Sequence, residues 1–104
     1  MREYDEDQES ISGWAEQTFG ACHINRAITR MLEEVKELEE INLLDSGALQ
    51  DECADVLITL YRVATIAGFD LHDAVERKMR VNRSRRWKRG EDGTGYHEKT
   101  LDNT

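Results

Sequence analysis

Two pairs of acidic side chains spaced three residues apart stand out in this 104-residue chain: Glu34 with Glu37, and Glu52 with Asp55. On a helix, residues at that spacing lie about 60° apart around the axis and ~4.5 Å apart along it, so one cation can bridge them. Four ionised carboxylates converging between two packed helices would repel one another and lose hydration, at roughly several kcal/mol per uncompensated ion. The pattern therefore predicts a bound cation.

The donor atoms offered by the two pairs favour Mg²⁺ or Mn²⁺. Hard divalent ions prefer oxygen ligands, and neither cysteine nor histidine stands at ligand spacing beside these acids. The Glu-x-x-His signature of di-iron bundles is also missing. The alternative is a solvated helical face, with the acids of EEVKELEE paired to Arg30 and Lys36. That alternative explains Glu39 and Glu40 well but Glu52 poorly, because Glu52 borders the apolar arc of its helix.

Helices are the elements expected to position these acids. The chain is 38% apolar, lacks proline, and is rich in Leu, Ala, Glu and Arg, which predicts an all-α, four-helix bundle-like unit. We expect a short helix from a Ser10 cap to Gly20, a second over about 25–41, a third from Asp45 or Ser46 to Gly68, and a fourth from Asp70 through Asn82. The third is apolar almost all round beyond Val56, so we expect it to be central, with Cys53 in the core.

The domain boundaries follow from composition. Residues 1–9 are expected to be a flexible acidic leader, 10–90 the folded domain, and 91–104 a loop or disordered tail. No apolar run approaches the roughly 20 residues that span a bilayer, and the N-terminus is acidic, unlike a signal peptide. Two cysteines make no disulfide framework. We therefore expect a cytoplasmic protein with reduced cysteines and no membrane partner.

Charge is divided unevenly along the chain. The net charge is −8, which argues against nucleic acid as a partner. Residues 1–60 carry 15 acids and 4 bases, whereas eight bases and no acid lie between Arg77 and Arg89. This basic segment is either an anion site or a complement to the acidic first half and to a helix dipole.

The acids resemble the motif of the all-α nucleoside triphosphate pyrophosphohydrolase superfamily, in its MazG-like branch. Glu33, Glu34 and Glu37 form E-E-x-x-E, and 14 residues separate Glu37 from the E-x-x-D of Glu52 and Asp55. The resemblance covers about residues 10–90. It implies that Glu34, Glu37, Glu52 and Asp55 bind Mg²⁺, for which Mn²⁺ can substitute. Glu33 would then lie outside the ligand set or act as the catalytic base that orients water.

The same resemblance extends to substrate-binding residues. Lys78, Asn82 and Arg85 match a family pattern K-x-x-x-N-x-x-R, and a helix continued to Arg86 would place them on one face to bind phosphates. Trp14 and Phe19 would stack on a nucleobase, as aromatic residues of the first helix do in similar proteins; the alternative for Trp14 is a core position.

The function implied is Mg²⁺-dependent hydrolysis of (deoxy)nucleoside triphosphates to the monophosphate and pyrophosphate. The alternatives are a phosphoribosyl-ATP pyrophosphohydrolase of the same superfamily, a non-catalytic helical interaction module, and nucleic-acid binding through the segment 77–89. The apolar surface over 56–67 exceeds what three neighbouring helices cover, so a homodimer or tetramer is expected.

Overall fold

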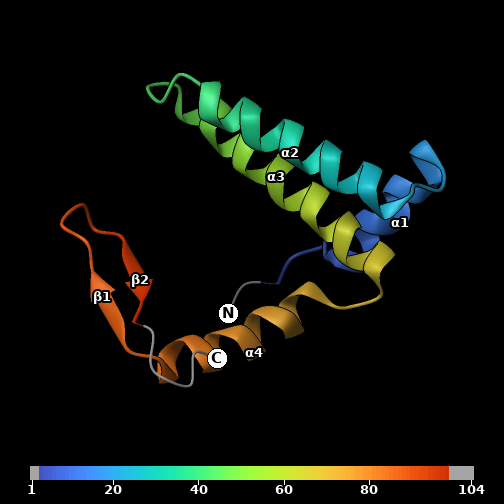
Figure 1. Ribbon diagram of the computed structural model, residues 1–104. Helices are drawn as coiled ribbons and strands as arrows, with labels where there is room; N and C mark the ends of the chain where they lie inside the picture. Colours follow the sequence, from blue (N-terminus) through green and yellow to red (C-terminus); the bar gives the residue numbers. More distant parts are fainter. Residues whose placement is uncertain (1–2, 99–104) are drawn as a thin grey trace. The chain divides into compact units, whose positions relative to one another are not determined.

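The computed structural model describes residues 3–98, and four helices make up most of that part of the chain (Figure 1). The elements in order are α1 (Gln8–Phe19), α2 (Ile24–Glu40), α3 (Ser46–Ala67), α4 (Leu71–Ser84), β1 (Trp87–Arg89) and β2 (Gly95–His97). The all-α class and the four helices are confirmed. The chain divides between Leu71 and His72 into two compact units. None of the described helices combines the length and apolar character needed to cross a membrane.

Helix α1 begins earlier than its expected Ser10 cap. Asp7 is the N-cap: its carboxylate accepts from the Ser10 backbone N–H, and the Ser10 hydroxyl accepts from the Asp7 N–H. This reciprocal pair is a capping box, with Ser10 on its inner side. The first helical residue, Gln8, consequently lies inside the segment 1–9 that was expected to be a flexible leader.

Helices α2 and α3 run antiparallel, side by side, and form the longest packed pair of the first unit (Figure 1). Asp45 caps α3 by accepting from the Ala48 N–H, as expected. Gly68 ends α3 in the left-handed conformation, with φ of 88°, which glycine adopts without steric cost. Because the connection between the two helices is short, the acid motif of α2 and the acid motif of α3 lie on neighbouring helices.

Polar contacts attach α1 to the C-terminal end of α3. The buried Ser12 hydroxyl lies 2.7 Å from the Thr65 hydroxyl. The Gln8 amide donates to Thr65 Oγ1 and to the Phe69 carbonyl, and its oxygen accepts from the Leu71 N–H at 2.7 Å. These bonds fix where α1 lies against α3.

The core of the isolated chain is small. Among the described residues, the buried apolar side chains are three alanines, Ala15, Ala27 and Ala64. Leu32 on α2 is 56% exposed and Leu57 on α3 is 44% exposed. Cys53 is exposed and not disulfide-bonded, so the expectation that it lies in the core is wrong for the single chain. The apolar arc of α3 is only partly covered because α3 packs on α1 and α2 alone within this unit.

The second unit differs from expectation in two places. Helix α4 stops at Ser84, so Arg85 follows the helix and the expected continuation to Arg86 is wrong. Residues 95–97 form β2, which pairs antiparallel with β1, where a loop over 91–104 was expected. The turn is fixed by Asp92, whose carboxylate accepts from the Thr94 N–H and hydroxyl, and by Gly93 with φ of 86°. Strands of three residues are too short to show a period in sequence. Residues 99–104 lie outside the described residues.

Candidate functional site

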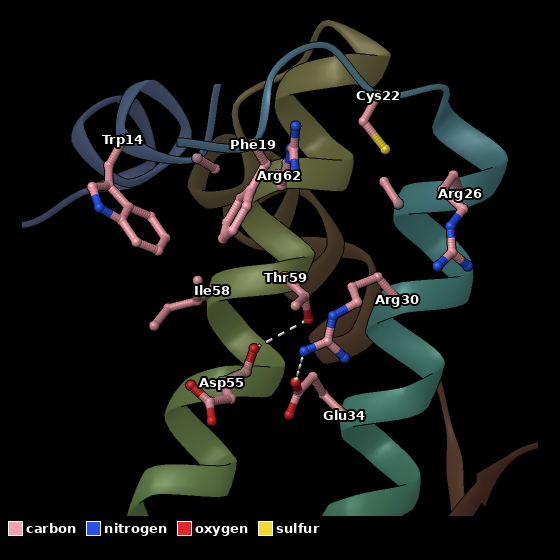
Figure 2. Close-up of a pocket in the computed structure, with 12 residues that line it drawn as sticks. Trp14, Phe19, Cys22, Arg26, Arg30, Glu34, Asp55, Ile58, Thr59 and Arg62 are labelled. Carbon is pink, nitrogen blue, oxygen red and sulfur yellow. Dashed lines mark hydrogen bonds and ion pairs between the residues drawn. The ribbon is translucent and has the colours of Figure 1, made fainter. Parts of the chain in front are cut away.

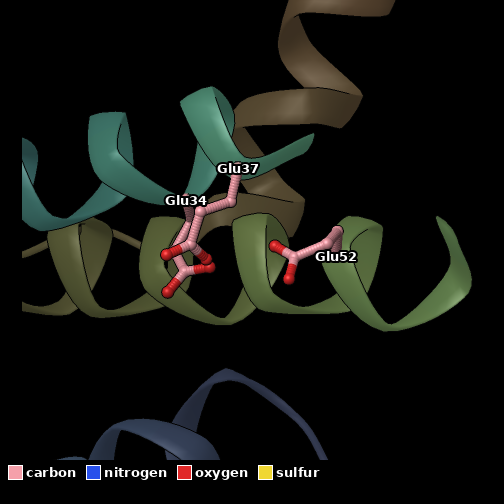
Figure 3. A group of neighbouring side chains, drawn as sticks. All are labelled: Glu34, Glu37 and Glu52. Atoms are coloured by element: carbon pink, nitrogen blue, oxygen red, sulfur yellow. The ribbon is translucent and has the colours of Figure 1, made fainter. Parts of the chain in front are cut away.

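Three of the four predicted metal ligands meet between α2 and α3. Glu34 and Glu37 from α2 and Glu52 from α3 each offer a carboxylate oxygen, and these oxygens lie within 4.8 Å of one another (Figure 3). These three carboxylates are brought together because α2 and α3 pack antiparallel against each other. Convergence across the two helices is therefore present in the folded chain.

The carboxylate of Glu34 is the most enclosed of the group. Glu34 is 5% exposed, and its Oε1 pairs with the Arg30 guanidinium one turn earlier on α2. The other oxygen, Oε2, is buried without a hydrogen-bond partner, as is Oε2 of Glu52. Unpaired buried carboxylate oxygens are costly, and a hard divalent cation is the ligand that would satisfy them. The donor set and the two orphaned oxygens both fit a divalent metal ion.

The acids also change one another's ionisation. The pKa of Glu37 is raised from its ordinary value, mainly by a hydrogen bond to Glu34 and by that residue's negative charge. The pKa of Glu52 is raised by desolvation and then by the charges of Glu37 and Glu34. Both shifts have the direction expected of a cluster that lacks enough positive charge.

Asp55 lies one turn beyond Glu52 on α3 and lines the same pocket as Glu34 (Figure 2). Its charge contributes to the raised pKa of Glu37 and of Glu52. It is outside the group of three whose oxygens meet. Glu33 is exposed on α2 and is likewise outside that group. The roles of these two acids stay predictions.

A pocket of about 350 Å³ opens beside the acids, between α1, α2 and α3 (Figure 2). Trp14 and Phe19 line it from α1, packed edge to face with ring centroids 5.4 Å apart. The Arg62 guanidinium lies 5.9 Å from the Phe19 ring centroid and donates to the Gly20 carbonyl. The two aromatic residues predicted to hold a base thus share one pocket with Glu34 and Asp55.

Three arginines of this pocket were not predicted as site residues: Arg26, Arg30 and Arg62. A signal was present in the sequence, because Arg26, Arg30 and Glu34 follow one another at intervals of four and so share one face of α2. Arg62 gave no such signal, since its partners on α1 are distant in sequence.

The predicted phosphate-binding residues belong to the second unit. Lys78 and Asn82 lie on α4, and Arg85 follows the helix end. The Trp87 indole donates to the Asn82 carbonyl, which ties the hairpin to α4, and Asn82 Oδ1 is buried without a hydrogen-bond partner. Their role in binding phosphate stays a prediction.

In this all-α domain, acids on two helices meet beside a pocket that is lined by aromatic and cationic side chains. Such a site is suited to binding a metal ion together with a charged ligand. Residues 23–89 match the family model of the MazG nucleotide pyrophosphohydrolase domain, and the chain belongs to this family. The resemblance found in the acid motif is confirmed.

Two phage proteins, both named dATP/dGTP diphosphohydrolase, are related in sequence. One, from Salmonella phage PMBT28, is 44% identical over 90 residues, which cover 86% of this chain but 30% of that protein. The chain therefore spans less than a third of that relative. The other, from Cyanophage S-2L, is 33% identical over 92 residues, covering 86% of this chain and 83% of that protein.

A solved structure is similar over nearly the whole fold. It is the Cyanophage S-2L MazG-like pyrophosphohydrolase bound to dGDP and three catalytic Mn²⁺ ions per active site. The TM-score is 0.75 at 30% identity, covering 89% of this chain and 90% of that one.

Replacing Glu52 by Gln should stabilise the metal-free protein at pH 7 and weaken divalent-metal binding by at least about tenfold. The raised pKa means that ionised Glu52 disfavours the folded state, a cost that glutamine removes. The advantage of the variant should shrink as the pH falls toward 4.5, because the wild-type carboxyl then becomes protonated. Denaturant unfolding in chelator and Mn²⁺ titration calorimetry measure the two effects.

Glu39→Gln is the matched control, because Glu39 is exposed on α2 outside the group of three acids. Lower metal-free stability of Glu52→Gln at pH 7, with unchanged metal affinity, would instead make Glu52 a structural residue.

Proposed function

We propose that this protein hydrolyses (deoxy)nucleoside triphosphates to the monophosphate and pyrophosphate, with Mg²⁺ as the metal and Mn²⁺ as a substitute. The observation that carries the proposal is the meeting of Glu34, Glu37 and Glu52 beside a pocket with aromatic and cationic walls. Its relatives are named for dATP and dGTP, so these two are the first substrates to test.

The acids would have two roles, which are to bind the metal and to activate water. Glu34, Glu37, Glu52 and Asp55 would hold the metal, and Glu33 would act as the base that orients the attacking water. A bound divalent ion supplies Lewis acidity, which makes water a better nucleophile near neutral pH and neutralises phosphate oxygens. The reaction needs no nucleophile from the protein.

The substrate would be held at two ends. Trp14 and Phe19, whose edge-to-face pair lines the pocket, would stack on the base. Lys78, Asn82 and Arg85 would bind the phosphates and stabilise charge on the departing pyrophosphate. We propose that the enzyme works in the cytoplasm, where such triphosphates are made, with no nucleic acid or membrane as partner.

A panel of ribo- and deoxyribonucleoside triphosphates with Mg²⁺, analysed for monophosphate and pyrophosphate, tests the activity. Asp55→Asn should lower kcat by about 100-fold or more, since removing a charged group at the metal costs at least ~3 kcal/mol of transition-state stabilisation. Asp51→Asn, an exposed neighbour on the same helix, should keep wild-type turnover.

The panel also separates the alternatives. Turnover of phosphoribosyl-ATP alone would assign the chain to that reaction of the superfamily. No metal-dependent turnover of any substrate would leave the non-catalytic interaction module.

Arg85→Ala should lower kcat/KM by roughly 10- to 100-fold, the loss of one charge-assisted hydrogen bond to phosphate. Metal affinity should be unchanged, because Arg85 is not one of the proposed metal ligands. Arg83→Ala, which removes an exposed base of α4, is the control. Kinetics identical to wild type would exclude Arg85 from the phosphate site.

We also propose that the protein is a homodimer or tetramer formed through the open apolar faces of α2 and α3. Leu32 and Leu57 lie on those faces and are exposed in the single chain, an arrangement that a second copy would bury. Sedimentation velocity at micromolar concentration should return a dimer or larger species, and Leu57→Gln should shift it toward monomer. Leu44→Gln, in the α2–α3 turn, should not. A wild-type monomer would contradict the proposal.

A further inference from the structure

One face of α2 carries two positive charges in the pocket. Arg26, Arg30 and Glu34 stand one turn apart in succession, and all three line the pocket between α1, α2 and α3 (Figure 2). Glu34 follows Arg26 by eight positions, which is about 12 Å along the helix axis. The arginines therefore form a cationic wall that starts beside the acids.

The two arginines differ in what holds them. Arg30 pairs with Glu34 Oε1 one turn later on the same helix, which holds its guanidinium beside the acids (Figure 2). Because a guanidinium has five N–H donors, that pairing leaves donors free for a second anion. Within residues 3–98, no hydrogen bond or ion pair holds the guanidinium of Arg26, which lies one turn from the like charge of Arg30. Like charges at that spacing are unfavourable unless an anion joins them.

Glu34 can serve the arginine and the metal at once. Its Oε1 faces Arg30 and its buried Oε2 has no partner, so a cation on Oε2 need not displace the guanidinium. The cationic wall therefore begins at Arg30, next to the oxygen of Glu34 on which a metal ion would bind.

The position of the wall within the pocket suggests which phosphate it binds. Trp14 and Phe19 line the pocket from α1, and Glu34 and Asp55 line it from α2 and α3. A nucleotide with its base on the aromatic pair and its scissile bond at the acids must lay its first phosphate inside this pocket. Arg30 and Arg26 are the cations that line the pocket from α2, one turn and two turns from Glu34 respectively.

We propose that Arg26 and Arg30 bind the phosphate that stays on the nucleoside after hydrolysis, forming a monophosphate subsite of their own. The proposal rests on the hydrolysis of nucleoside triphosphates proposed above. It assigns the two halves of the substrate to different residues: the retained monophosphate to α2, and the departing pyrophosphate to Lys78, Asn82 and Arg85.

Calorimetric titration of the full chain with dGMP and, separately, with pyrophosphate, both in excess Mg²⁺, tests this assignment without turnover. Arg26→Gln should weaken dGMP binding by about tenfold or more and leave pyrophosphate binding within about twofold of wild type. Arg85→Ala should show the opposite pattern. Arg83→Gln, outside both sets, should bind both ligands as wild type does.

Arg26→Gln is the primary variant because the Arg26 side chain makes no hydrogen bond or ion pair with any residue of the described part of the chain, so the substitution removes no such bond there. For Arg30, Arg30→Lys keeps the charge beside Glu34 and should lose part of the dGMP affinity, because an ammonium cannot bridge carboxylate and phosphate in the planar manner of a guanidinium.

Each outcome decides something. The monophosphate subsite is overturned if Arg26→Gln keeps wild-type dGMP affinity, or if it loses dGMP and pyrophosphate affinity equally. In either case the proposed function stands if the unmodified protein hydrolyses a triphosphate. A wild-type protein that binds neither ligand and hydrolyses no triphosphate overturns both.

Discussion

The structure depends on the free-energy cost of placing negatively charged carboxylates between two helices. Glu34 is enclosed between α2 and α3, with one oxygen satisfied by Arg30 and the other left without a partner. Glu37 and Glu52 add negative charge within a few ångströms. A single guanidinium does not balance three carboxylates, and the raised pKa values of Glu37 and Glu52 reflect that shortfall. Stability is given up here for a charge distribution suited to cations, as is common at functional sites.

Much of the fold was predictable because its signals are local. Single residues predict the Gly68 stop of α3 and limit its N-cap to Asp45 or Ser46, of which Asp45 is the cap. The apolar spacing of α2 predicts that helix to within about one residue at each end. The start of α1 was missed because aspartate and serine both cap helices. Only the hydrogen bonds show that Asp7 is the N-cap and that Ser10 is the third helical residue of its capping box. The hairpin was missed because each strand has three residues.

The acid group was predictable for a related reason. Spacing within a helix fixes which side chains share a face, and the antiparallel packing of α2 and α3 then brings the faces together. The pocket was less accessible, because its walls come from three helices. Arg62 reaches Phe19 and Gly20 across more than 40 residues of sequence, and no periodicity encodes that contact. Cys53 was misplaced because its position on the apolar arc of α3 does not show whether a neighbouring helix of the chain covers that part of the arc, and here it is exposed.

The attachment of α1 has a consequence for how this family can diversify. The first helix is joined to α3 through hydroxyl and amide groups at Ser12, Thr65 and Gln8, whereas the carboxylates stand on α2 and α3. The aromatic side chains that line the pocket and the group of three carboxylates therefore stand on different helices. Substitutions on the pocket side of α1 would change the shape of the pocket and leave the carboxylates of α2 and α3 as they are.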